Sequence, residues 1–127
     1  MKPVKQNLEI WQGKTYEEPF TFGRAVKNEA GELVDIIATN LSGYTGRMQL
    51  RSSIDSEDVV IELTTENDRI IIDANNGIVT LYISDEDTAL LPVGSYKYDL
   101  ELITASGRVY GPLYGTVKVK AEVTRDA

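Results

Sequence analysis

The fold is decided by the stretch SYKYDLELI, residues 95–103, in which apolar and charged side chains alternate. The apolar positions are Tyr96, Tyr98, Leu100 and Leu102, and the positions between them are Lys97, Asp99 and Glu101. Because successive side chains of a β-strand point to opposite faces, this spacing predicts a strand with one buried and one solvated face. The two tyrosines are therefore expected to belong to the core.

The same alternation recurs in TVKVKAEVT, residues 116–124, and predicts a second strand. The connection Thr104–Gly107 is short, polar and contains glycine, which favours a hairpin that returns from near Arg108. Pro112 cannot donate a hydrogen bond to a neighbouring strand, so we expect a bend, a bulge or a solvent-side edge position there. A single regular strand over residues 108–124 is not expected.

Further strands are predicted along the rest of the chain. Short runs typical of strands cover residues 8–11, 15–22, 44–51, 58–63, 69–73 and 78–84. Gly13-Lys14 predicts a turn, Glu29-Ala30-Gly31 a hairpin tip, and Asn76-Gly77 a type I′ hairpin, since Asn and Gly tolerate positive φ. This spacing predicts an all-β protein, an immunoglobulin-like antiparallel β-sandwich of about seven to nine strands.

One short helical turn is expected at about residues 85–91. Ser84 can cap it, the acids Asp85, Glu86 and Asp87 suit the positive end of a helix dipole, and Pro92 stops it. We therefore interpret the three acids as capping residues rather than as a catalytic carboxylate pair. With 127 residues, the chain is expected to form a single domain over residues 1–127.

Composition argues against an enzyme of a familiar kind. The sequence contains no histidine and no cysteine, which removes Ser-His-Asp and Cys-His sites and most zinc sites. The segment Asp73–Gly77 superficially resembles a calcium loop, but Ile78 and Ser84 stand where an EF-hand needs Gly and Glu. We expect no catalytic residues, no metal and no cofactor.

Charge and hydropathy limit the partners and the compartment. The net charge is −7 and the 13 basic residues are scattered, so neither nucleic acid nor an anionic membrane is expected to bind. No apolar run approaches the ~20 residues of a membrane span, and the N-terminal MKPVKQN has no signal-peptide core. These features predict synthesis in the cytoplasm.

The candidate contact surface lies where the C-terminal strand is expected to be irregular. Tyr110 and Tyr114 flank Pro112 there, and these three residues are the predicted partner contacts. The seven tyrosines and Trp11 could instead form a sugar-stacking platform, although Tyr96 and Tyr98 are better explained as core. An exposed coplanar aromatic pair would favour the sugar platform, whereas an exposed strand edge or apolar patch would favour protein docking.

Several segments together resemble a family of phage proteins. They are DTALLPVGSYKYDLEL (87–102), GRVYGPLYGTVKV (107–119), GKTYE (13–17), FTF (20–22), Asp35-Ile36 and LSGY (41–44). The chain is similar along most of its length to the immunoglobulin-like N-terminal module of tailed-bacteriophage upper baseplate proteins. Those proteins continue into further domains, whereas this sequence stops at Ala127.

The resemblance implies a non-catalytic structural virion protein of the baseplate, tail or neck. Such a protein would be made in the host cytoplasm, reside in the virion, and dock to other virion proteins, where it could hold a receptor-binding fibre or spike. Association between copies of the chain within the virion is a further option. The alternatives are a carbohydrate-binding β-sandwich that recognises host glycans, and a capsid decoration or cement protein.

Overall fold

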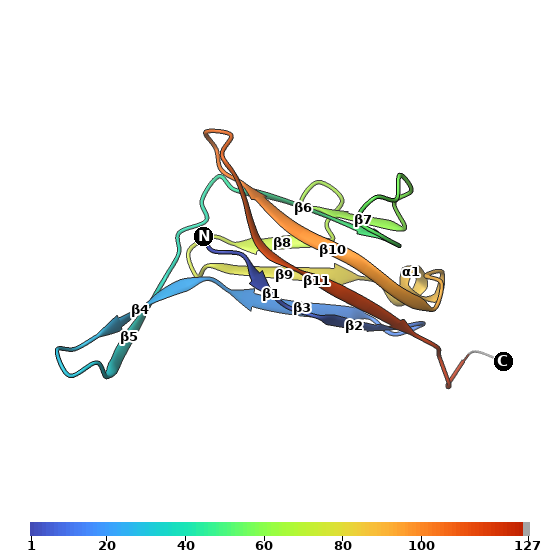
Figure 1. The fold of residues 1–127 in the computed structure, drawn as a ribbon, viewed down its shortest axis with the longest axis horizontal. Coiled ribbons are helices and arrows are strands. Elements are labelled where there is room, and N and C mark those ends of the chain that lie inside the picture. The colour runs from blue at the N-terminus through green and yellow to red at the C-terminus, as the bar shows by residue number, and fades with distance from the viewer. Residues whose placement is uncertain (126–127) are drawn as a thin grey trace.

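The chain folds as an immunoglobulin-like antiparallel β-sandwich, as the alternating sequence predicts. The computed structural model describes residues 1–125, and Figure 1 shows two facing sheets with a narrow arm that projects from one end. The strands are β1 (Val4–Lys5), β2 (Leu8–Trp11), β3 (Tyr16–Thr21), β4 (Gly23–Lys27), β5 (Leu33–Ala38), β6 (Thr45–Arg51), β7 (Ile61–Thr64), β8 (Ile70–Asp73), β9 (Ile78–Ile83), β10 (Gly94–Ile103) and β11 (Val109–Lys120), and the helix is α1 (Asp85–Ala89).

The strands form two layers and an arm. The first layer, sheet A, has the order β1-β11-β10-β6-β7, and β2 also pairs with β11. The second layer, sheet B, has the order β3-β9-β8, and β4 and β5 form a separate two-stranded sheet. Neighbours are antiparallel except that β1 and β2 both run parallel to β11. The eleven strands of residues 1–125 exceed the predicted seven to nine because β1 and the arm add short strands.

The core lies between sheet A and sheet B. The four apolar positions of β10 are all buried, so the prediction that Tyr96 and Tyr98 belong to the core is confirmed. Sheet A also contributes Met48, Leu50 and Val117, and sheet B contributes Val79, Leu81 and Ile83. These side chains recur at every second position, because each strand buries only one of its faces.

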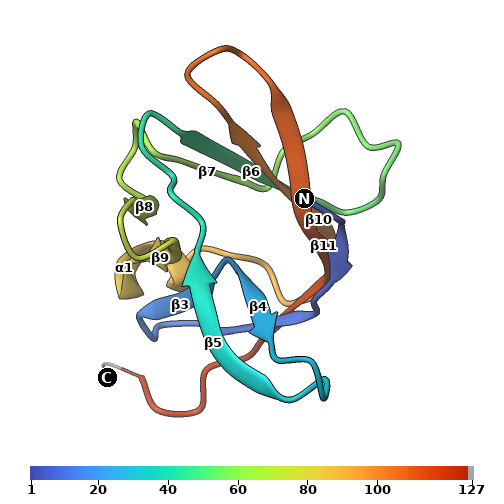
Figure 2. The same cartoon turned by 90° about the vertical axis from the view of Figure 1, so that its left-hand side faces the viewer.

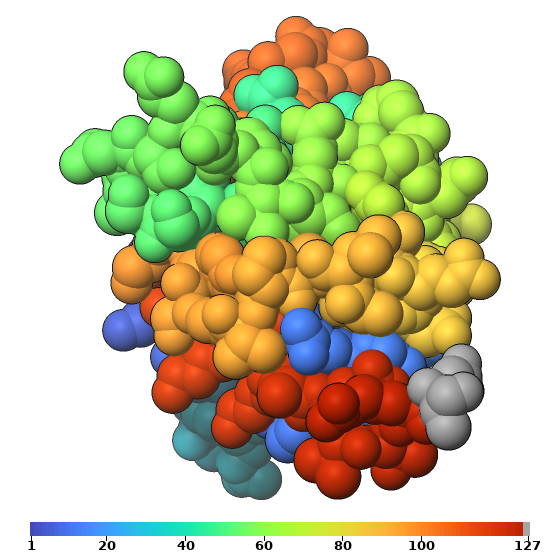
Figure 3. Space-filling model, turned by 90° about the vertical axis from the view of Figure 1, so that its right-hand side faces the viewer, coloured from blue at the N-terminus to red at the C-terminus, as the bar shows by residue number. Residues whose placement is uncertain are grey.

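The connection from β9 to β10 is held by side-chain hydrogen bonds. Ser84 caps α1 by accepting from the Asp87 amide at 3.2 Å, which confirms the predicted cap. The Tyr96 hydroxyl donates to the carbonyl of Pro92 at 2.6 Å. Immunoglobulin-like sandwiches use such a tyrosine corner to fix the chain where it crosses between sheets. In Figure 3 the segment around α1 and residues 121–125 cover the end of the sandwich opposite the arm.

Strand β11 departs from the prediction in its length and confirms it in its irregularity. It continues through Pro112 and ends at Lys120, so the predicted strand over residues 121–124 is wrong. At the end of β11 the Gln12 amide donates to the Lys120 carbonyl at 3.0 Å. This is the last hydrogen bond of the β2–β11 pair. The register shifts near Pro112: Leu100 pairs with Leu113, but Leu102 pairs with Tyr110. Two residues of β11 therefore face one of β10, which is the expected bulge.

The predicted turns are present, with one difference in turn type. Asp73 and Ile78 pair across the predicted hairpin, but only Gly77 has positive φ (63°), so type I′ is wrong. A type I turn followed by a left-handed glycine fits instead, because it needs positive φ at one residue only. The predicted turn at Gly13-Lys14 is confirmed, and it links β2 of sheet A to β3 of sheet B. The tip at Glu29-Ala30-Gly31 closes the arm, as predicted.

Candidate functional site

The bulge in β11 separates the predicted contact residues. Tyr110 pairs with buried Leu102, whereas Tyr114 pairs with Asp99 on the outer face of sheet A. Directly paired residues share one face of a sheet, so the two tyrosines point to opposite faces. In a regular strand, residues four apart would have shared a face. Tyr110, Pro112 and Tyr114 therefore do not form one contact surface.

The three residues also differ in exposure. Tyr114 is 45% exposed, Tyr110 is half-buried, and Pro112 is buried. In this chain Pro112 shapes the strand at the bulge, and its side chain is not presented to solvent. Tyr114 is the member of the predicted set that is placed to contact another molecule.

A pocket lies around Tyr114 on the outer face of sheet A. One row of side chains crosses β1, β11, β10 and β6 as Lys5, Tyr114, Asp99 and Gln49, and the next crosses β11, β10 and β6 as Thr116, Lys97 and Arg51. Ile54, from the connection between β6 and β7, adds an apolar wall. The volume is about 520 Å³, within the range of small-ligand sites.

Hydrogen bonds hold two of the pocket cations in place. Arg51 donates through Nη1 to the Ser56 carbonyl at 2.6 Å and through Nη2 to Gln49 Oε1 at 2.7 Å. Lys97 Nζ donates to Thr116 Oγ1 at 3.1 Å. The ion pairs found within residues 1–125 join other residues, so Lys5, Arg51 and Lys97 have no carboxylate within 4.0 Å in that part of the chain.

Asp99 is the acidic residue of the pocket. Burial raises the pKa of its carboxyl group above the usual range, and the Glu101 carboxylate raises that pKa further. Arg47 acts in the opposite direction but is itself paired with Glu101 at 2.8 Å. Within residues 1–125 no side chain forms a hydrogen bond or ion pair with the Asp99 carboxyl group, so its oxygens can accept from a ligand in the pocket.

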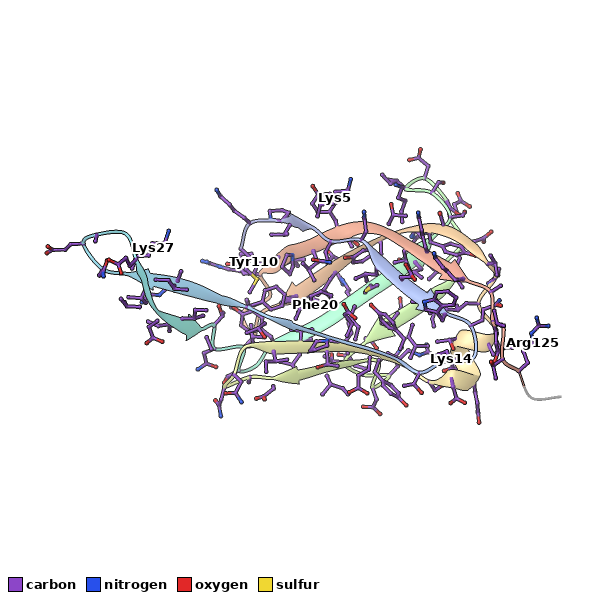
Figure 4. The ribbon with its side chains drawn as sticks, turned by 90° about the horizontal axis from the view of Figure 1, so that it is seen from below. Lys5, Lys14, Phe20, Lys27, Tyr110 and Arg125 are labelled. Carbon is purple, nitrogen blue, oxygen red and sulfur yellow. The ribbon has the colours of Figure 1, made fainter. Side chains whose placement is uncertain are left out.

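The arm formed by β4 and β5 is a second candidate surface, which the sequence reading did not single out. Four of its aliphatic side chains are exposed: Leu33 by 58%, Val34 by 59%, Ile36 by 61% and Ile37 by 43%. Consecutive strand residues point to opposite faces, so Ile36 and Ile37 make both faces apolar. Figure 4 shows the arm extending away from the sandwich, with Lys27 near its tip, and Figure 2 looks onto that end of the molecule, with β4 and β5 in front.

The alternative of a sugar-stacking platform needs exposed aromatic side chains that lie close together. Trp11 is 46% exposed, and Lys120 Nζ lies 5.6 Å from its ring centroid. Trp11 pairs with Lys120, six positions along β11 from Tyr114, which is about 20 Å in a strand, so these aromatics form no platform. In residues 1–125 no group of three acidic side chains is arranged to hold a metal ion.

Asp87 of α1 and Asp73 of the segment that resembles a calcium loop are both engaged in local contacts. Asp87 accepts from Arg69 Nη2 at 2.9 Å, and this hydrogen bond lowers the pKa of Asp87. Asp73 accepts from Asn76 Nδ2 at 2.9 Å within the turn. Across the part of the chain that the structure describes, no helix has the length and apolar character to cross a membrane.

Comparison with known proteins supports the fold and goes no further. No protein-family model matches the chain, and no curated protein sequence matches it. Among solved structures, a chicken TCR is similar with a TM-score of 0.53 and 8% sequence identity. The alignment covers 98% of this chain, and this chain spans 57% of that chain's length. The fold defines an immunoglobulin-like domain; at this identity the likeness carries no function.

Proposed function

We propose that the chain is a non-catalytic structural protein of a tailed-bacteriophage virion that docks to other virion proteins through the β4–β5 arm. The place in the virion is suggested by the resemblance of residues 87–119 to upper baseplate modules, and the baseplate, tail or neck are its candidate locations. The absence of histidine and cysteine from the sequence supports a role without catalysis.

The observation that carries the docking role is the apolar, two-stranded arm. A hairpin without further strands is marginally stable in water, and within residues 1–125 no third strand pairs with β4 or β5. The arm thus offers free backbone edges as well as exposed aliphatic side chains. Partners commonly add strands to such edges, with main-chain hydrogen bonds supplying affinity and side-chain pockets supplying specificity.

The attachment of the arm to the sandwich also suits a docking element. The Phe22 amide donates to the Gly77 carbonyl at 2.8 Å, and the Thr39 amide donates to the Phe22 carbonyl at 2.9 Å. The first bond attaches the start of the arm to the β8–β9 turn of sheet B, and the second attaches the residue after β5 to Phe22. The arm therefore projects in a defined direction rather than as a free loop.

Incorporation into particles tests this function. A tagged full-length chain is expressed during phage growth, tailed particles are purified, and the tag is located by immunogold electron microscopy. The chain is expected on the tail, baseplate or neck. Ile36→Ser on β5 should lower its incorporation several-fold, because it removes an apolar contact from the arm.

The matched control is Ile71→Ser on the edge strand β8, where an isoleucine is 53% exposed. Both variants should melt close to the parent chain, because neither residue is part of the core. A chain that is abundant in the cell but absent from purified particles would contradict the virion assignment. Equal incorporation of both variants would instead remove the arm from the interface.

A further inference from the structure

The pocket on the outer face of sheet A has an unusual charge for this chain. Acidic residues outnumber basic ones by 20 to 13, yet the pocket gathers three cations and one carboxyl group. The cations come from β1, β6 and β10, which are far apart in sequence and are aligned by strand register. A concentration of positive charge in an acidic protein attracts a small anion more than it attracts polyanionic nucleic acid, which needs a wider basic surface.

Arg51 and Lys97 keep hydrogen-bond donors that no residue of the pocket uses and that a ligand can therefore bind. Each terminal nitrogen of Arg51 carries two hydrogens and uses one, so Arg51 keeps further donors with its guanidinium already oriented. Lys97 uses one of its three donors on Thr116. Arginine held in this way is suited to bind a planar carboxylate.

Besides its cations, the pocket has an aromatic wall and an acidic wall, which a site for a simple anion would not need. Tyr114 presents a large ring, 45% exposed, beside the cations. Asp99 stands next to it and offers acceptor oxygens, which would repel a phosphate or an isolated carboxylate but accept hydrogen bonds from hydroxyl groups. The pocket thus combines donors for an anion, acceptors for hydroxyls and an aromatic face.

We propose that this pocket binds a small acidic sugar, such as a hexuronic acid or a sialic acid. Arg51 and Lys97 receive the carboxylate, Asp99 accepts from ring hydroxyls, and Tyr114 packs against the apolar face of the sugar ring. The volume of about 520 Å³ accommodates one or two sugar units. This site is separate from the β4–β5 arm, so it does not depend on the docking role.

The test is a titration of the full-length chain followed by backbone amide NMR, in a buffer without carboxylate or phosphate. The probes are glucuronic acid, N-acetylneuraminic acid, glucose and succinate. At least one of the two acidic sugars should shift resonances of the pocket residues at millimolar concentration. Glucose and succinate should bind about ten-fold more weakly or worse, because glucose lacks the carboxylate and succinate lacks the sugar ring with its hydroxyl groups.

Two variants and a control assign the binding to the pocket. Lys97→Met and Tyr114→Ala should each weaken binding of the acidic sugar by about ten-fold or more. Lys118→Met removes a lysine from the same strand as Tyr114, outside the pocket, and should leave the affinity unchanged. Thermal melts of the three variants verify that each is folded.

Three results would overturn the proposal. Failure of both acidic sugars to bind at tens of millimolar would eliminate the site. Succinate binding as tightly as the sugars would indicate that the pocket takes an acidic protein side chain. Equal binding of glucose would show that the cations contribute nothing to recognition.

Discussion

The Tyr96 hydroxyl lies 2.6 Å from the carbonyl oxygen of Pro92, four residues earlier in the chain. This hydrogen bond spans the turn between α1 and β10, at the point where the chain passes from sheet B to sheet A. Pro92 thus has two functions, because its ring ends the helix and its carbonyl anchors the next strand.

Replacing Tyr96 with Phe should destabilise the fold without changing it. The variant loses one hydrogen bond and leaves a carbonyl without its partner, at an expected cost of about 0.5–1.5 kcal/mol. Urea denaturation measures the difference. Tyr82→Phe is the control, because its hydroxyl makes no hydrogen bond to any residue from 1 to 125. Equal stability of the two variants would mean that the tyrosine corner contributes nothing.

Replacing Tyr16 with Phe should not destabilise the fold, in contrast to the same replacement at Tyr96. Its hydroxyl is buried and has no hydrogen-bond partner within the described residues, and burial raises the pKa of the phenol. A buried polar group without a partner costs stability, so Tyr16→Phe is expected to leave the free energy of unfolding unchanged or to raise it by about 1 kcal/mol. A clear loss of stability in the same urea assay would show that the hydroxyl is satisfied in solution.

Glycine at position 77 should tolerate no side chain. Its φ is 63°, and a Cβ there would lie 2.5 Å from the Phe22 carbonyl oxygen and 2.9 Å from that of Thr39. Gly31 also has positive φ, but nothing lies within 4 Å of its Cβ position. Gly31→Ala should therefore lower the free energy of unfolding only by the cost of a positive φ in a residue with a side chain, about 1–2 kcal/mol. Gly77→Ala should lower it distinctly more, because its Cβ also collides with the two carbonyl oxygens. Equal melting temperatures would contradict the contact between the β8–β9 turn and the base of the arm.

Acid should weaken the fold partly through Asp87. The Arg69 hydrogen bond lowers the pKa of Asp87 in the folded state, so its stabilising contribution is fully present above the ordinary pKa, near 4. That contribution is lost as the pH falls through the lowered value. Asp87→Asn should lower stability at pH 7 and flatten the decline below pH 4, relative to Asp55→Asn in an exposed connection. Identical pH profiles for the two variants would rule out this linkage.

The sequence predicted the sandwich well because its main signal is local. Alternation in residues 95–103 requires only that one face be buried, and the structure confirms it. The same reasoning failed for Tyr110 and Tyr114, because a bulge changes the face of every residue beyond it. Pro112 signalled that a bulge was near but could not reveal its register.

The arm and the pocket were missed for different reasons. Residues 33–38, LVDIIA, show no alternation, and a strand with such a run is usually buried on both faces. Here both faces of the strand are exposed. The sequence pattern alone would therefore predict burial where the structure has exposure. The pocket joins Lys5, Arg51 and Lys97, whose proximity depends on which strands are neighbours. No spacing within the sequence contains that information.

The parallel pairing of β1 and β2 with β11 has a consequence for synthesis. The Thr116 amide donates to Asn7 Oδ1 across 109 residues of chain. A ribosome that adds about 5–20 residues per second needs roughly 5–20 s to cover that separation. During this interval Leu8 and Ile10, which are buried in the finished fold, have no strand to join. Until β11 emerges, these apolar residues of the nascent chain can aggregate or bind chaperones. Substitutions in β11 should therefore lower the yield of folded protein even where they leave the binding surfaces of the folded protein unchanged.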